Sequence, residues 1–119
     1  MGKFGFKTKF GWLDAKVGRY PNGHLGIHLF QDGFPYAYLS SNLIDTKLEP
    51  REFHFDQNKL WDLYGDLMSC GHFEDTNRED KSGFCTYPVL KLKEHIEIVE
   101  GWKPLFFLQL SFRHGRDHA

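Results

Sequence analysis

Two neighbouring turn signals constrain this chain more than any other feature of its sequence. Asn22-Gly23 and Asp32-Gly33 each lie between stretches in which apolar residues alternate with other residues. Such dipeptides are the strongest short-range signals for β-hairpins, because their residues tolerate the positive φ that tight turns require. Residues 12–43 are therefore predicted to form a three-stranded antiparallel meander, and the remaining segments are expected to extend or cover it.

The same turns predict the register of the three strands. A two-residue Asp32-Gly33 loop predicts the cross-strand pairs Gln31–Phe34, Leu29–Tyr36 and Ile27–Tyr38. For the first turn a three-residue loop, Pro21 to Gly23, is preferred to a two-residue one, because Pro21 has no N–H for the ladder and Gly23 suits a left-handed bulge. The predicted core face then consists of Ala15, Val17, Leu25, Ile27, Leu29, Tyr36 and Tyr38.

The opposite face of the meander is mixed in character, and two interpretations of it stay open. It carries Lys16, Gly18, Tyr20, His24, Gly26, His28, Phe30, Ala37 and Leu39. One interpretation is a half-solvated sheet face partly covered by another segment. The other is a recognition surface, with the glycines leaving a shallow groove.

Alternation and turn residues assign the rest of the chain. Residues 3–12 are predicted to form one strand with Phe4, Phe6, Thr8, Phe10 and Trp12 on its buried face. Residues 52–56 and 84–92 are predicted strands. Asp56 is the predicted cap of a helix that Gly71 ends, and residues 74–83 are a predicted mobile charged loop. Strands are predicted at 95–99 and 105–112, before a frayed tail.

These elements predict one α+β domain over residues 1–119. Its expected architecture is an antiparallel sheet of about five to seven strands, with one main helix packed on one face. Aromatic residues make up 17% of the chain, which favours strands. The net charge of −1 argues against a strongly basic nucleic-acid binder and against an acidic DNA mimic.

Composition also predicts where the protein works. No apolar run reaches the length of a membrane span, and the first ten residues lack the apolar core of a signal peptide. Two cysteines in such a chain are expected to be reduced thiols. A cytoplasmic protein is therefore expected.

The histidines and cysteines do not match a known metal pattern. His24 and His28 share one strand face, but four strand residues span about 13 Å, which is too far for one metal ion. Cys70, His72, Cys85 and His95 lack the paired spacing of zinc sites. Neither a metal nor another cofactor is predicted.

Three classes of function remain, and the first is favoured. A protein-binding role would use interface-prone side chains at Arg19, Tyr20, His24 and His28, and the charged segment with Glu74, Asp75, Glu79 and Asp80. A nucleic-acid-binding role would use Lys3, Lys7, Lys9 and Lys16, but the aromatic residues of the predicted first strand fall on the face opposite its lysines. A small enzyme would use Tyr20, His24 and His28, although no motif here obliges a reaction.

Three stretches resemble a known family. They are GWLDAKVGRYPNGHLGIHL from Gly11, DGFPYAYLSSNL from Asp32 and SGFCTYPV from Ser82. They resemble short uncharacterised proteins encoded by phages and by integrative or conjugative elements of bacteria. The resemblance spans roughly residues 10–92, and residues 93–119 form an extension outside it.

The resemblance implies a context and no catalytic residue. It implies an accessory protein of a mobile element, in the cytoplasm of a bacterial host. By analogy of context, such a protein is expected to act by occupying a host protein, as a monomer or homodimer. One specific form is a counter-defence inhibitor of the anti-CRISPR or anti-restriction type, whose partner is a component of a defence system.

Overall fold

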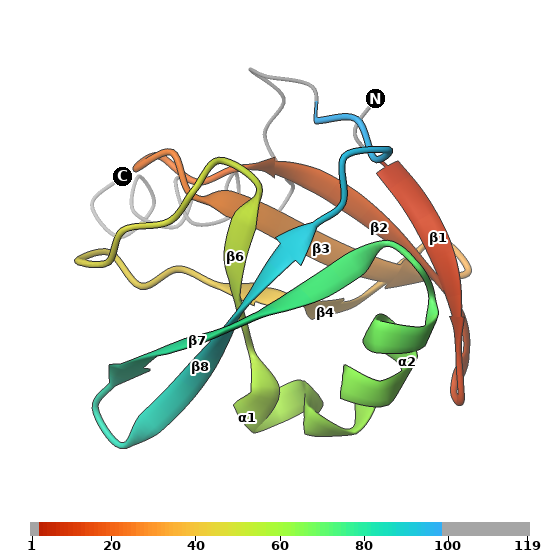
Figure 1. Cartoon of the computed structure of the whole chain (residues 1–119). Coiled ribbons are helices and arrows are strands. Elements are labelled where there is room, and N and C mark those ends of the chain that lie inside the picture. Colours follow the sequence, from red (N-terminus) through yellow and green to blue (C-terminus); the bar gives the residue numbers. More distant parts are fainter. Residues whose placement is uncertain (1–2, 99–119) are drawn as a thin grey trace, which may run out of the picture.

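The computed structural model describes residues 3–98, which form two four-stranded antiparallel sheets and one helical segment (Figure 1). The first sheet has the order β1 (Lys3–Thr8), β2 (Gly11–Arg19), β3 (Leu25–Gln31) and β4 (Phe34–Tyr38). The second has the order β5 (Ser40–Ser41), β6 (Glu52–Phe55), β8 (Cys85–Leu92) and β7 (Phe73–Ser82). The α+β class and the antiparallel strands are confirmed, whereas the predicted single sheet is divided into two.

The two sheets form layers around one hydrophobic core, with β6, β8 and β7 in front of the first sheet in Figure 1. Leu39 joins the layers, because its N–H donates to the carbonyl of Ile27 and its carbonyl accepts from the N–H of Asp56. The core receives its apolar side chains from both sheets and from the helical segment, among them Phe6, Leu13, Val17, Ile27, Leu29, Phe53, Phe55, Leu63, Leu67, Phe73 and Leu90.

The first hairpin of the meander forms as predicted. Val17 pairs with Ile27 and Ala15 pairs with Leu29, which the three-residue loop requires. The loop is closed by the Tyr20 N–H, which donates to the His24 carbonyl at 2.8 Å. Gly23 takes a φ of +91°, the left-handed conformation expected at the last loop position. The apolar residues predicted for this part of the core face are buried.

The second hairpin departs from the prediction by one residue. Gln31 pairs with Phe34, but the register then shifts and leaves Tyr36 unmatched as a β-bulge. The predicted pairs Leu29–Tyr36 and Ile27–Tyr38 are wrong, and the observed pairs are Leu29–Ala37 and His28–Tyr38. Because a slip of one residue exchanges the two faces of a strand, Tyr36 and Tyr38 are exposed and Leu39 enters the core.

The predicted strand over residues 3–12 is instead a hairpin. The Thr8 hydroxyl accepts from the Phe10 N–H at 3.0 Å and donates to the Gly11 carbonyl at 2.8 Å, which closes a turn over Lys9-Phe10. Gly11 has a φ of +103°, so it permits this reversal. Phe6 stays in the core, but Phe10 and Trp12 are exposed rather than buried.

The helical segment begins after Asp56 and ends at Gly71, whose φ is +87°. It consists of α1 (Gln57–Leu60), the 3₁₀ turn η1 (Trp61–Leu63) and α2 (Tyr64–Ser69). Its buried side chains are Leu60, Leu63 and Leu67. The predicted cap is correct in position only, because the Asp56 side chain makes no capping hydrogen bond.

The charged segment predicted as a mobile loop is the strand β7. It pairs with β8 from Phe73–Leu92 to Ser82–Cys85, with a bulge between Asp75 and Arg78. Residues 93–98 contain a turn and no strand, so the strand predicted at 95–99 is wrong for its described part. The predictions for residues 105–119 lie outside the described residues. No helix within residues 3–98 is long and apolar enough to cross a membrane.

Candidate functional site

The predicted binding residues of the meander do not form one surface. Arg19 and His24 border a groove beside residues 46–50, and the Arg19 guanidinium donates to the Pro50 carbonyl at 2.8 Å. Tyr20 is buried, and its hydroxyl lies 3.0 Å from the Ser40 hydroxyl. Burial is the main cause that raises the pKa of Tyr20 to about 12. Tyr20 is therefore a core residue and not part of a surface.

His28 is also a core residue. Only 2% of it is exposed, and its ring packs against Phe30 and Tyr38, with centroids 4.3 Å and 4.4 Å away. Burial, helped by the nearby Lys16 ammonium, lowers the pKa of His28 to about 4. At neutral pH this imidazole is uncharged. The predicted exposure of His28 is wrong, because its side chain is buried.

The predicted acidic residues all lie on β7 but have different surroundings. Glu74 and Glu79 are exposed. Asp75 accepts a hydrogen bond from the Tyr64 hydroxyl at 2.6 Å, which is the main cause that raises the pKa of Tyr64. Asp80 points back to the sheet, where its carboxylate lies 2.8 Å from Nε2 of His54. Asp75 and Asp80 are thus already bonded within the fold, although 39% of the Asp80 side chain is still exposed.

His54 lies between the predicted acidic residues and the predicted meander residues, because it contacts both Asp80 and His24. No sequence pattern assigned it a role. It is fully buried on β6, and its Nε2–H donates to Asp80. Its ring centroid lies 6.3 Å from that of His24, whose Nδ1 is 3.1 Å from Oδ1 of Asn42. A carboxylate-oriented imidazole resembles a general-base unit. His54 itself is closed to solvent, and its Nδ1 is a buried atom without a hydrogen-bond partner in the described part of the chain.

The mixed cysteine and histidine set is only partly assembled. Nδ1 of His72 lies 2.9 Å from Nε2 of His95, and Cys70 is two residues from His72 along the chain. Burial is the main cause that raises the pKa of the Cys70 thiol. Cys85 stands at the far end of β8, opposite Ser82. Among the residues that the structure describes, no three His, Cys, Asp or Glu side chains are placed to hold a metal ion.

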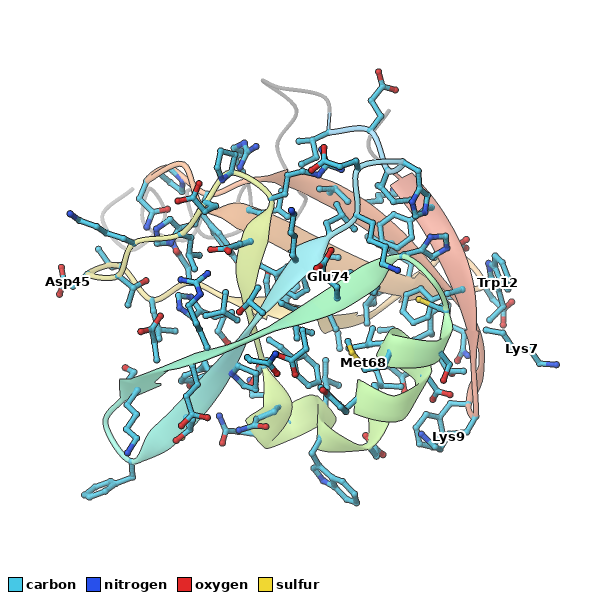
Figure 2. The ribbon with its side chains drawn as sticks, in the orientation of Figure 1. Lys7, Lys9, Trp12, Asp45, Met68 and Glu74 are labelled. Carbon is cyan, nitrogen blue, oxygen red and sulfur yellow. The ribbon has the colours of Figure 1, made fainter. Side chains whose placement is uncertain are left out.

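Trp12 lies beside a member of the lysine set, although the alternation of residues 3–12 predicts it on the opposite face. Trp12 pairs with Lys7 across β1 and β2, and Figure 2 shows both projecting on the same side of the molecule. The indole lies over Gly5, where an added Cβ would come within 2.4 Å of it, and donates to Asp14 at 3.0 Å. The turn after Thr8 therefore places this aromatic ring beside the lysines and not opposite them.

The other lysines are held in different surroundings. Lys9 forms an ion pair with Asp66 at 2.9 Å, and the Lys16 ammonium lies 4.6 Å from the centroid of the Phe30 ring. Lys3 pairs with Lys16 across the strands. Lys9 and Lys16 are therefore engaged by other side chains of the fold.

The feature that stands out on the surface is the outer part of the β7–β8 hairpin. β6 pairs with β8 only as far as Val89, whereas β7 accompanies β8 to the Ser82–Cys85 pair. Beyond Val89 the hairpin is a two-stranded arm, and Figure 1 shows it extending past the sheet at the lower left. Phe84 occupies the turn at its tip and is completely exposed, at 108% of its reference area.

The helical segment is fastened to this arm. The Gln57 side chain donates to the Thr86 carbonyl at 2.9 Å. Trp61, one turn further along, is 71% exposed. Phe84, Thr86, Gln57 and Trp61 define a surface that we call the hairpin–helix surface. The sequence shows a turn at Ser82-Gly83. The exposure of Phe84 and Trp61 depends on where β6 and the helical segment end, and the sequence pattern does not specify these ends.

Comparison of the chain with family models, with curated proteins and with solved structures finds no match. The resemblance of residues 10–92 to proteins of phages and mobile elements therefore stays a prediction. The geometry of the hairpin–helix surface is the firmer basis for a function.

Proposed function

We propose that this protein is a non-enzymatic protein-binding module whose hairpin–helix surface contacts the partner. The observation that carries the proposal is the complete exposure of Phe84 at the tip of a projecting arm. A phenylalanine held in water gains nothing for the fold, since it contacts no core. Aromatic residues are enriched at protein interfaces and among the residues that dominate binding energy.

The energy available at this tip is large enough to anchor a complex. Burying a fully exposed phenylalanine side chain contributes about 1.5–3 kcal/mol. Trp61 offers a second large apolar group on an element bonded to the same arm. The Gln57–Thr86 hydrogen bond holds the hairpin and the helical segment together. The Phe84 and Trp61 rings therefore lose little conformational entropy on binding.

The proposed partner is a protein of a bacterial host. The resemblance to proteins of phages and mobile elements supports this context, and the cytoplasm of the host would be the place of action. A counter-defence inhibitor that occupies a defence-system component is the specific form that we favour. Such an inhibitor needs a surface that binds its partner tightly, and it needs no catalytic residue. Exposed aromatic side chains such as Phe84 and Trp61 suit that requirement.

The experiment is a capture of the tagged protein from a bacterial lysate, with and without nuclease treatment. We expect a stoichiometric protein partner that survives nuclease and is lost with the variant Phe84→Ser. Phe34→Ser is the matched control, because Phe34 is also highly exposed, at 74%, but lies at the β3–β4 turn. A partner retained by Phe84→Ser, or lost equally with both variants, would contradict the proposal.

A second candidate function is binding of single-stranded nucleic acid, which the placement of Trp12 favours. An exposed indole beside Lys7 offers a base-stacking surface next to a positive charge. Titration of labelled oligonucleotides would test it. Affinity that falls steeply with salt and is lost with Trp12→Ala would support this function. Unchanged affinity in that variant would exclude the Trp12 surface.

A further inference from the structure

A cavity of about 340 Å³ lies between β4 and the first turn of α1, outside the hairpin–helix surface as defined above. Its lining includes the apolar groups of Tyr36, Tyr38 and Leu60, and the polar groups of His28, Asp56 and Lys59. A concave site with mostly apolar walls and a few polar groups is typical of a ligand pocket. The β-bulge at Tyr36 contributes to it, since it turns both tyrosines away from the core.

Asp56 is the unusual member of this cavity. Only 8% of the residue is exposed. Its backbone is fully used, because its carbonyl accepts from the N–H groups of Lys59 and Leu60 and its N–H donates to Leu39. Within residues 3–98, however, no hydrogen bond or ion pair reaches its carboxylate. Its oxygens are not among the buried side-chain atoms without a partner, so they are open to the cavity, where a cationic group can contact them.

We propose that this cavity binds a guanidinium group, supplied by an arginine side chain of the partner protein. The carboxylate of Asp56 would accept the guanidinium N–H groups. Tyr36 and Tyr38 offer partly exposed rings on which the planar cation stacks. The volume is sufficient for one arginine side chain.

The inference rests on the proposed protein-binding function and names one group that the partner must contribute. The cavity adjoins the hairpin–helix surface, because Gln57, which bonds to the hairpin, directly follows Asp56. His28 does not oppose a cation at neutral pH, since its imidazole is uncharged there. Lys59 is exposed and carries the same charge as the proposed ligand, so it weakens the binding.

The test is a titration with N-acetylarginine amide, followed by the backbone amide resonances in NMR spectra. We expect saturable shifts at residues 36–38 and 56, and none with the neutral counterpart N-acetylcitrulline amide. Asp56→Asn should weaken binding at least about tenfold, because a hydrogen-bonded charge is lost. Lys59→Gln should strengthen it. Equal shifts with both compounds, or unchanged affinity in Asp56→Asn, would overturn the proposal.

Urea unfolding tests whether Asp56→Asn loses binding because the variant is misfolded. Without ligand, this variant should unfold at nearly the same urea concentration as the wild type, because the Asp56 side chain makes no capping hydrogen bond that the substitution could remove. A lower midpoint would mean that the carboxylate already has a stabilising partner, and this too would overturn the proposal.

Partner capture then separates the source of the cation from the anchor. If the partner is lost with Asp56→Asn and with Phe84→Ser, the arginine belongs to that partner. If Asp56→Asn binds the partner normally but not N-acetylarginine amide, a free small cation is the ligand and the partner assignment is wrong. If Phe84→Ser still captures the partner while Asp56→Asn does not, the proposed anchor is wrong.

Discussion

Acidification is expected to destabilise this protein through one buried side chain, His28. Its pKa is about 4 in the folded protein, because burial and then the Lys16 ammonium disfavour the imidazolium, against an ordinary value of 6.5. Between these two pH values the unfolded chain binds a proton that the folded protein does not bind. The free energy of unfolding therefore falls as the pH drops through 6.5, and this loss is complete near pH 4.

The size of this effect follows from the two pKa values. The full difference corresponds to about 3 kcal/mol, and about 2 kcal/mol of it is lost between pH 7 and pH 5. For a chain of this size, 2 kcal/mol lowers the urea midpoint by about 1 M. Glu52 and Asp66 do not interfere in this window, because the pKa of each carboxyl is lowered and its contribution is lost only at more acidic pH.

Urea unfolding of the wild type and of His28→Gln at pH 7 and pH 5 measures this contribution. Glutamine does not titrate, so the variant should lose about 2 kcal/mol less than the wild type over the same interval. Lys16→Gln should reduce the pH dependence in part, because it removes the smaller cause of the shift. Parallel losses in wild type and His28→Gln would refute the reasoning, whatever the absolute stability of the variant.

Three further predictions test the packing. Gly65→Ala should stabilise the protein by about 0.5–1 kcal/mol, because an added Cβ contacts nothing in the helix. Gly71→Ala should destabilise it by about 1–2 kcal/mol, because a φ of +87° is unfavourable for alanine. Thermal unfolding should therefore give changes of opposite sign for the two variants. Phe73→Ala should cost about 3–5 kcal/mol in urea unfolding, since the ring is buried. Gly5→Ala should shift the indole N–H resonance of Trp12, and an unshifted resonance would contradict the contact.

Local turn chemistry accounts for the parts of the fold that the sequence predicts well. The loop at Gly23 and the helix end at Gly71 each need a left-handed residue, and the chain supplies a glycine at both. The errors come from turns and bulges that interrupt stretches of continuous alternation, including the turn where Gly11 takes a φ of +103°. A Thr8 hydroxyl closes the first turn, and one unmatched tyrosine shifts the second hairpin, although alternation continues through both stretches.

The candidate sites were harder to predict, because they depend on contacts between distant segments. Charge suggested a loop at residues 74–83, but pairing with β8 orders this segment as a strand. His28 and Tyr20 alternate onto the polar face of the meander, yet both are buried. The exposure of Phe84 follows from where β6 stops, and the isolation of the Asp56 carboxylate follows from a capping bond that does not form.

The central claim, that the tip of the β7–β8 hairpin anchors a partner protein, is tested most directly by site-specific photo-crosslinking in bacterial cells. A benzoylphenylalanine in place of Phe84 should give one discrete adduct with a protein, and Trp61→Ser should reduce its yield. The same probe in place of Phe34 should give no such adduct. Absence of an adduct at position 84, or the same adducts at both positions, would contradict the account.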